Sequence, residues 1–293
     1  MFRSAGFSIG DPFEKRIGQV IKKGLEKTDV ALLGVPWDGA AATRAGSRAA
    51  PKKIREHFYS LPYQGGFEIC DYGDVDTLNG DPQETWKRTV EAVKLSVQNS
   101  LETLVMGGDS TSSYCAFKAF CELEKEPCYL LFDAHPDVRV EYPGLTSGRV
   151  VRWIREASAS SKIIVVGVRE HSNHPYLFTE AKKLKVEIIT MSQIENQGLN
   201  TLLERLLKEL SGQALQISVN MDAFDPSCAP GVNSPSVGGF YSRELLWLVE
   251  KLCQTLKPKL FDLVEFTPCY DVMDMSALLA ATTLSKAIWV KRA

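Results

Sequence analysis

Short runs of apolar and β-branched residues alternate with longer amphipathic segments along almost the whole chain of 293 residues. The apolar runs cover residues 30–35, 103–106, 129–132, 162–168, 186–190, 214–221 and 260–265. Continuous apolar runs of this length are typical of strands buried on both faces, and the amphipathic segments between them are typical of crossover helices. The alternation therefore predicts an α/β fold with a mostly parallel central sheet.

The helix signals between these runs are local. Residues 81–84, Asp-Pro-Gln-Glu, place an N-cap aspartate, a first-turn proline and a glutamate where a helix starts, so we predict a helix from Pro82 toward Gln98. Ser242 is predicted to cap a helix that ends near Leu256, and residues 276–290 predict a closing apolar helix. No linker rich in Pro, Gly or Ser divides the chain, so residues 1–293 are predicted to form a single domain.

Composition limits the kinds of partner. A formal net charge of −2 and the absence of a Lys/Arg block argue against nucleic acid as a ligand. The seven cysteines lack CxxC spacing, which is typical of reduced thiols rather than of a disulfide framework or structural zinc. The first residues form no signal peptide, and no run of 18 apolar residues occurs, so we expect a cytoplasmic protein without a membrane segment.

Polar residues gather at the ends of four of the predicted strands. These clusters are MGGDS at 106–110, DAHPD at 133–137, SVNMDAFDP at 218–226 and VEFTP at 264–268. Ligand sites in parallel α/β sheets lie beyond the carboxyl ends of the strands. A single fold is therefore expected to bring these clusters to one edge of the sheet.

The DAHPD cluster has the residue types of a metal site. Asp133, His135 and Asp137 are two residues apart, so on extended backbone their side chains face the same way. Carboxylate oxygens with an imidazole suit Mn²⁺, Fe²⁺ or Zn²⁺, and Asp222, which has the same spacing from Asn220, offers a further carboxylate. The alternative is that these residues are capping or turn carboxylates in a solvated loop at the sheet edge. Residue spacing alone leaves both interpretations open.

The order of the four clusters resembles that of the ureohydrolase family, which includes arginases, agmatinases, formiminoglutamases and guanidino-acid hydrolases. The resemblance extends over nearly the whole chain, from LGVPWDG at 33–39 through RAGSR at 44–48 to the VEFTP cluster. Agmatinase-like members are the most similar, on the strength of DPSCAPG at 225–231 and VGGF at 237–240. The resemblance implies a three-layer α/β/α fold in which two Mn²⁺ ions at the strand ends activate water for attack on a guanidinium or amidine carbon. It also implies a homo-oligomer, a trimer or a hexamer.

The ligand set that the resemblance implies is incomplete in this chain. Members of the family hold the two metals with four carboxylates and two imidazoles, and the matching ligands here are Asp133, His135, Asp137 and Asp222. Ser110 stands where the family has a histidine, and Asn220 stands where it has the aspartate that bridges both metals. The histidine that shuttles protons in the family, after a Thr-Ser-Gly stretch, aligns near Val150 or Val151, so it is also missing.

The resemblance assigns roles to the remaining residues. Glu265 matches the glutamate that pairs with a guanidinium, so Glu265 and Asp137 are the candidate catalytic residues. Arg139 and Ser147 lie in the loop that contacts the far end of the substrate in relatives, which favours an anionic ligand. Arg149 lies in the same loop, and the simpler interpretation of both arginines is that they are solvated surface charges.

Charge leads to an expectation about activity. Two Mn²⁺ ions carry four positive charges, and only three carboxylates remain among the matching ligands. We therefore expect at most one Mn²⁺ ion and weak or no hydrolysis of linear C–N bonds in a small guanidino or amidino compound. Two alternatives remain: an active agmatinase-like or arginase-like hydrolase with one metal or an unusual metal, and a non-catalytic binding or regulatory subunit.

Overall fold

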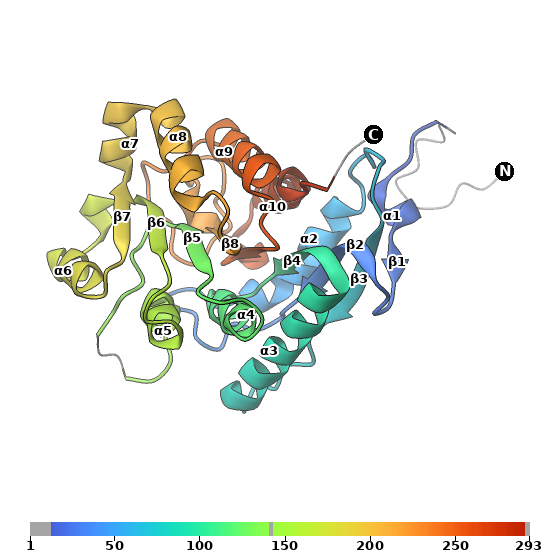
Figure 1. The fold of residues 1–293 in the computed structure, drawn as a ribbon, viewed down its shortest axis with the longest axis horizontal. Helices are drawn as coiled ribbons and strands as arrows, with labels where there is room; N and C mark the ends of the chain where they lie inside the picture. Colours follow the sequence, from blue (N-terminus) through green and yellow to red (C-terminus); the bar gives the residue numbers. More distant parts are fainter. Residues whose placement is uncertain (1–12, 141–142, 291–293) are drawn as a thin grey trace.

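A computed structural model describes residues 13–140 and 143–290 of the chain (Figure 1). Nine strands in this part form one sheet in the order β1-β3-β2-β4-β9-β8-β5-β6-β7, and all neighbouring strands are parallel. The predicted α/β fold with a central parallel sheet is confirmed.

Seven of the strands coincide with the seven apolar runs. They are β2 (Thr28–Gly34), β4 (Ser100–Met106), β5 (Cys128–Phe132), β6 (Ile163–Val168), β7 (Glu187–Thr190), β8 (Leu215–Asn220) and β9 (Leu260–Val264). Two strands were not predicted, β1 (Lys22–Lys23) and β3 (Ile69–Asp74). Their residues are largely polar, because β1 lies at the edge of the sheet and the second half of β3 is partly exposed. Neither strand therefore has the apolar run by which buried strands are predicted.

Helices cover both faces of the sheet. On one face lie α2 (Ala50–Phe58), α7 (Met191–Gln197), α8 (Leu199–Leu210), α9 (Ser242–Leu256) and α10 (Met275–Ala287), and on the other lie α3 (Pro82–Asn99), α4 (Thr111–Cys121), α5 (Val150–Ala157) and α6 (Pro175–Lys183). A short helix, α1 (Ile17–Val20), precedes the edge strand β1 (Figure 1). This is the three-layer α/β/α arrangement that the family resemblance implies.

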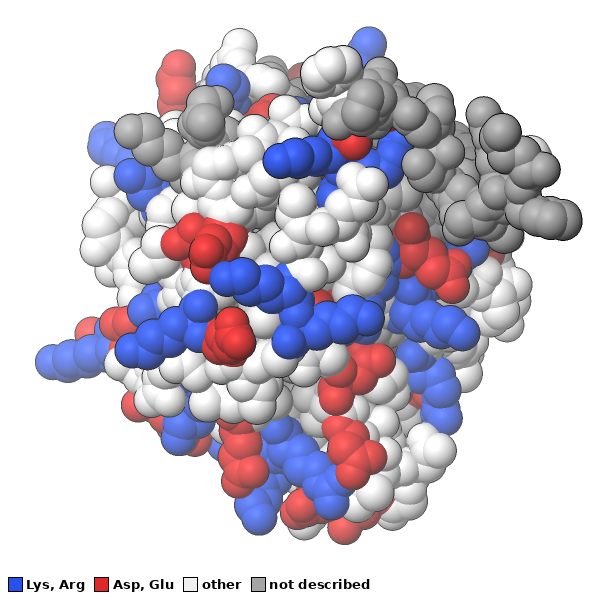
Figure 2. All heavy atoms as spheres, turned by 90° about the vertical axis from the view of Figure 1, so that its right-hand side faces the viewer, with Lys and Arg blue, Asp and Glu red and all other residues white. Residues whose placement is uncertain are grey.

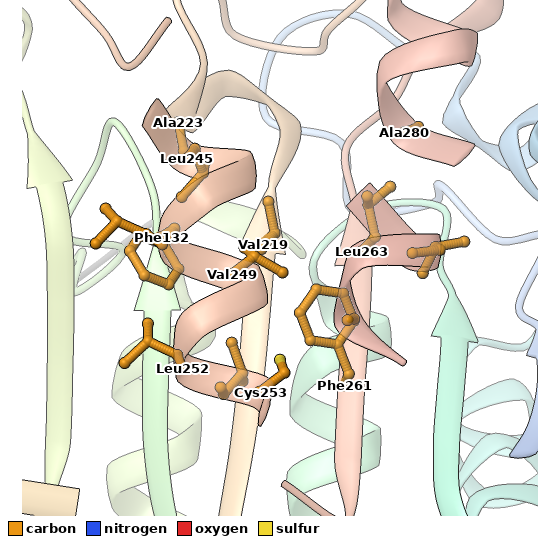
Figure 3. Close-up of a cluster of buried hydrophobic side chains, with 14 of the residues drawn as sticks. Phe132, Val219, Ala223, Leu245, Val249, Leu252, Cys253, Phe261, Leu263 and Ala280 are labelled. Atoms are coloured by element: carbon orange, nitrogen blue, oxygen red, sulfur yellow. The ribbon is translucent and has the colours of Figure 1, made fainter. Parts of the chain in front are cut away.

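The packing between α9 and the sheet shows how the layers hold together. Leu245, Val249 and Leu252 of α9 are fully buried and lie over Phe132 of β5 and Val219 of β8 (Figure 3). Burying each such side chain contributes about 1.5–3 kcal/mol. This packing keeps the carboxyl ends of β5 and β8 in place, and those ends carry two of the polar clusters.

Most predicted helix ends agree with the structure, including the end of α9 at Leu256, and two differ. Asp81 caps α3, because its Oδ1 accepts the N–H of Glu84 at 3.0 Å. Ser242 is the first residue of α9 rather than its cap; the preceding Tyr241 occupies the N-cap position. The last helix, α10, ends at Ala287 rather than at residue 290.

The surface carries charges of both signs. Figure 2 shows one face of the molecule, on which basic and acidic side chains are interspersed. Within residues 13–140 and 143–290, no helix is both long enough and apolar enough to cross a membrane.

Candidate active site

The four polar clusters follow β4, β5, β8 and β9, which are adjacent in the sheet in the order β4-β9-β8-β5. All four strands are parallel, so their carboxyl ends meet at one edge. The prediction that one fold brings these clusters together is confirmed. Chain order does not predict which strands are neighbours, because β9 inserts between β4 and β8.

The glycine pair after β4 makes a close backbone contact. A Cβ atom on Gly108 would lie 1.8 Å from the carbonyl oxygen of Trp37, so only glycine fits there. The carbonyl of Gly108 accepts the N–H of Glu265 at 2.8 Å, and the N–H of Asp109 donates to Trp37 at 2.8 Å. Gly107 and Gly108 therefore form a tight turn, and the turn ties the end of β4 to that of β9.

Asp109 has a structural role beside this turn. Its carboxylate is fully buried and accepts the N–H groups of Ala40 at 2.8 Å and of Thr111 at 3.0 Å. Burial raises the pKa of Asp109 to about 6, although these hydrogen bonds favour the ionised form. Asp109 thus connects the loop after β2 to the first turn of α4.

Asp133, His135 and Asp222 form a compact group at the ends of β5 and β8. The Nδ1 atom of His135 lies 3.2 Å from Oδ2 of Asp222 and 3.4 Å from Oδ1 of Asp133. One potential ligand atom from each residue lies within 4.8 Å of the other two. Asp133 and Asp222 are fully buried, so the interpretation of these acids as solvated loop residues is wrong.

Asn220 holds Asp133 by a hydrogen bond. Its side-chain amide donates from Nδ2 to Oδ2 of Asp133 at 2.8 Å, and its Oδ1 accepts the N–H of Asp222 at 3.3 Å. The second contact fixes the direction of the amide, so the N–H side faces Asp133. Asn220 therefore presents a donor to the carboxylate of Asp133.

The charges of this group influence one another strongly. Burial, together with the charge of Asp222, raises the pKa of Asp133 to about 6. Burial opposes the charged form of His135, but the adjacent carboxylates of Asp222 and Asp133 prevail and raise the pKa of His135 well above 6.5. The two carboxylates therefore favour a positive charge between them. Either a bound cation or the protonated imidazole of His135 can supply that charge.

Asp137 and Glu265 share an uncommon backbone conformation. Their φ angles are +50° and +66°, in the left-handed region that residues other than glycine seldom adopt. Both line the same cavity as His135. Burial raises the pKa of both carboxyl groups well above their usual values, with further contributions from Asp133 to Asp137 and from Asp109 to Glu265. Backbone strain beside acids with raised pKa values is typical of functional sites.

Glu265 has one carboxylate oxygen in use and one free. Oε1 accepts the N–H of Ser110 at 2.8 Å, whereas Oε2 is buried and has no hydrogen-bond partner among the described residues. The hydroxyl of Ser110 is likewise buried without a partner in the described part of the chain. A buried acceptor costs about 1–3 kcal/mol when it is unpaired, so Oε2 is suited to receive a donor from a ligand.

A cavity of about 310 Å³ lies over this group. Its lining brings together six of the predicted site residues: His135, Asp137, Arg139, Ser147, Asp222 and Glu265. Asn173, Asn220 and Asn233 are among the other polar residues that line it. Within the described ranges, the guanidinium of Arg139 forms no ion pair. The cavity therefore combines buried acids with a free basic group.

Other candidate residues lie outside this cavity. Arg149 packs over the ring of Trp153, with its guanidinium carbon 5.9 Å from the ring centroid. Val150 and Val151, which the resemblance aligns near the family's shuttle histidine, are the first two residues of α5 and are buried in the core. Neither side chain can titrate.

Asn233 and Thr43 are cavity residues that the sequence did not indicate. The hydroxyl of Thr43 contacts Oδ1 of Asn233 at 2.9 Å, and Asn233 leaves its Nδ2 group buried without a partner in the part of the chain that is described. They come from loops 190 residues apart in the sequence, after β2 and after β8. No local pattern links the two loops, because only the tertiary fold brings them together.

Two carboxylates and one imidazole within 4.8 Å match the oxygen and nitrogen ligands that Mn²⁺ accepts. A second ion needs further ligands near Asp133. There the Asn220 amide points its donor at Asp133.

The fold and these residues define a class of protein: a parallel α/β/α protein with an acid and imidazole group of the metal-binding kind at the carboxyl edge of its sheet. The sequence model of the Arginase family matches residues 28–289. The chain is 30% identical to the formimidoylglutamase of Bacillus subtilis (strain 168) over 98% of its own length and 95% of the relative's. It is 30% identical to the human mitochondrial guanidino acid hydrolase over 88% and 77% of the two lengths, and 28% identical to the agmatinase of Bacillus subtilis (strain 168) over 90% and 92%.

The crystal structure of formimidoylglutamase from Bacillus subtilis subsp. subtilis str. 168 aligns with a TM-score of 0.90 at 28% identity and covers 98% of this chain and 95% of that one. This chain belongs to the arginase family, which is the ureohydrolase family indicated by the motifs. With 30% identity to the formimidoylglutamase and 28% to the agmatinase of Bacillus subtilis (strain 168), the chain is about as similar to one as to the other.

Proposed function

We propose that this protein binds a small amidino or guanidino acid and hydrolyses its C–N bond weakly, with a site equipped for a single divalent ion. The observation that carries the proposal is the group of Asp133, His135 and Asp222, of which His135 and Asp222 line a cavity together with Glu265 and Arg139. Family membership supports the reaction class, and the replaced ligands support the low rate.

Asp133, His135 and Asp222 would hold the ion. A bound divalent ion supplies Lewis-acid character and lowers the pKa of water near it. Two ions are disfavoured because the three carboxylates of Asp133, Asp137 and Asp222 face four positive charges, and Asn220 contributes a dipole instead of an anion. We therefore infer one Mn²⁺ ion per chain at most.

Glu265 and Arg139 would orient the ligand. The free Oε2 of Glu265 is suited to accept an N–H from an amidinium, and such charge-assisted hydrogen bonds are strong. Arg139 lines the same cavity without an ion-pair partner in the described ranges and is suited to a carboxylate. Ser147 adds a hydroxyl to the cavity wall. Together they favour a substrate with a cationic amidine at one end and a carboxylate at the other.

A second candidate function is that of a non-catalytic binding or regulatory subunit. The observation that favours it is the position of Val150 and Val151, which fill the core where the family has its shuttle histidine. With Ser110 and Asn220, this makes three departures from the machinery of the family. Such a protein would still bind the ligand through Glu265 and Arg139.

One experiment separates these functions. Protein prepared with Mn²⁺ is assayed for bound metal, for release of urea from agmatine, 4-guanidinobutyrate and arginine, and for release of formamide or ammonia from formimidoylglutamate. We expect one ion per chain and slow turnover. Turnover should be faster for 4-guanidinobutyrate than for agmatine, because 4-guanidinobutyrate has a carboxylate for Arg139 where agmatine has an ammonium group. Two ions per chain with fast turnover would contradict the single-metal proposal. Binding without turnover would favour the regulatory subunit.

The role of Arg139 has a matched control. Arg139→Gln should weaken binding of 4-guanidinobutyrate about tenfold or more, because it removes a charged partner. Arg149→Gln changes the same residue type in the same loop but outside the cavity, and should leave that binding unchanged. Equal losses in the two variants would rule out a specific contact by Arg139.

The same proposal includes a homo-oligomer of this chain, as the family resemblance implies. Light scattering on the purified protein gives the mass directly. A mass of three or six chains would support the proposal, and a monomer would contradict it.

A further inference from the structure

Arg169, directly after β6, is a buried charge without an ion pair. Its side chain is about 1% exposed, and its guanidinium donates to main-chain carbonyl oxygens. Nη1 contacts Gly167 at 3.0 Å, and Nη2 contacts Ala223 at 2.7 Å and Phe224 at 3.3 Å. Within the described ranges, Arg169 forms no salt bridge and its Nε has no partner. Buried charges are normally paired, so this arrangement calls for a compensating charge nearby.

The compensating charges are those of the acid group. Ala223, which accepts from Nη2, directly follows Asp222. The N–H of Arg169 donates to the carbonyl of Ala134, which directly follows Asp133, at 3.1 Å. Arg169 is thus tied to both segments that carry the acids, although it contacts neither carboxylate.

Electrostatics agrees with this placement. Burial lowers the pKa of Arg169, while the negative charges of Asp222, Asp133 and Asp225 act in the opposite direction. A guanidinium remains charged in proteins even when it is buried. A permanent positive charge therefore lies behind the group that would hold the divalent ion.

The surrounding chain leaves room for this side chain. A Cβ atom on Gly239 would lie 1.7 Å from Nη2 of Arg169 and 2.7 Å from the carbonyl oxygen of Ala223. Any other residue at position 239 would displace the guanidinium or the segment after β8. Glycine at this position permits the buried arginine.

We propose that Arg169 is a fixed counter-charge for Asp133 and Asp222: it offsets their negative charge in the metal-free protein and weakens their affinity for a divalent cation by repulsion. The inference rests on the proposed function in that these two acids, with His135, hold the ion. It assigns to Arg169 a positioning role and no contact with substrate. Arg169 thereby favours a protein that folds without metal.

The competing explanation is that Arg169 is only a structural tie through its hydrogen bonds to carbonyl groups. Two variants separate charge from hydrogen bonding. Arg169→Gln keeps an amide donor and loses the charge, whereas Arg169→Lys keeps the charge and loses the planar fork of donors. A change in Arg169→Gln that Arg169→Lys does not share would indicate a role of charge, and equal changes in the two variants would indicate a structural tie.

The test is a titration of the full-length protein with Mn²⁺, followed by the electron paramagnetic resonance signal of the free ion. We expect Arg169→Gln to bind Mn²⁺ about tenfold more tightly than the wild type, a change of the size seen for residues around metal ligands. Arg169→Lys should stay within about twofold of the wild type. Equal affinities in the two variants, or weaker binding by Arg169→Gln, would overturn the proposal.

A second arm uses thermal unfolding in EDTA and in saturating Mn²⁺. Loss of the charge should lower the midpoint of Arg169→Gln in EDTA below that of Arg169→Lys, and Mn²⁺ should restore it, because the ion takes over the neutralising role. An Arg169→Gln protein that stays unfolded with Mn²⁺ present, or that matches Arg169→Lys in EDTA, would refute the counter-charge.

The two arms also separate this inference from the proposed function. Asp222→Asn removes a ligand and should abolish Mn²⁺ binding. If the wild type itself binds no Mn²⁺, the metal part of the proposed function fails, and the comparison of Gln with Lys in EDTA alone decides the role of Arg169.

Discussion

Replacing Asn220 by aspartate tests the site most directly, because the amide that donates to Asp133 then becomes a carboxylate that faces it. The Nδ2 atom of Asn220 lies 2.8 Å from Oδ2 of Asp133, and both side chains are buried. In Asn220→Asp this hydrogen bond is replaced by the repulsion of two negative charges. At a separation of about 4 Å and an effective dielectric constant of about 20, the repulsion amounts to about 4 kcal/mol.

Part of this repulsion is relieved by proton uptake. Closely spaced carboxylates share one proton, and the pKa of Asp133 is already raised to about 6 by burial and by the charge of Asp222. We therefore expect Asn220→Asp to lose about 2–4 kcal/mol of stability at pH 7.5 in EDTA. For a chain of this size, that loss corresponds to a fall of about 3–7 °C in the unfolding midpoint.

The assay is thermal unfolding with EDTA and with excess Mn²⁺. Mn²⁺ should raise the midpoint of Asn220→Asp more than that of the wild type, because the ion neutralises the new pair of charges. Asn220→Leu is the control of similar size: it leaves Asp133 without its donor, costs about 1–3 kcal/mol and gains no extra stability from Mn²⁺. The reasoning is refuted if Asn220→Asp is as stable as the wild type in EDTA, or if Mn²⁺ stabilises both proteins equally.

Three further predictions concern the site and the sheet beneath it. Combining Ser110→His with Asn220→Asp should raise the metal content from at most one Mn²⁺ per chain to two, measured by inductively coupled plasma mass spectrometry; unchanged uptake would mean that the ligand assignment is wrong. Because Asp133 must lose its proton to bind a cation, Mn²⁺ affinity should fall by up to about tenfold per pH unit below pH 6, and calorimetry that finds no pH dependence would contradict its role as a ligand. Burial raises the pKa of Asp262 from 3.8 to about 6. Between these two pH values the folded protein keeps the carboxyl proton of Asp262, whereas the unfolded chain releases it. The free energy of unfolding therefore falls by about 3 kcal/mol as the pH rises from below 4 to above 6. In urea unfolding, the stability of Asp262→Asn relative to the wild type should increase by about this amount from below pH 4 to above pH 6, and a flat difference would show that Asp262 does not titrate in this way.

Local sequence determined the parts of this protein that depend on near neighbours along the chain. Apolar runs predicted the seven buried strands, because a strand covered on both faces needs no polar residue. The spacing of Asp133, His135 and Asp137 predicted that all three converge, because extended backbone points alternate side chains to the same face. Asp133 and His135 do meet, whereas Asp137, with a φ of +50°, is not part of the group that they form with Asp222. The family motifs likewise led to the prediction that Ser110 and Asn220 stand where the family has metal ligands.

Tertiary structure decided what depends on segments far apart in the chain. The insertion of β9 between β4 and β8 places Glu265 beside Ser110, 155 residues away in the sequence, and no periodicity encodes that neighbourhood. The fold also distinguishes Arg139, which lines the cavity, from Arg149, which packs on Trp153. It sets the direction of the Asn220 amide and buries Arg169 behind the acids, since hydrogen bonds and electrostatic interactions act through space rather than along the chain.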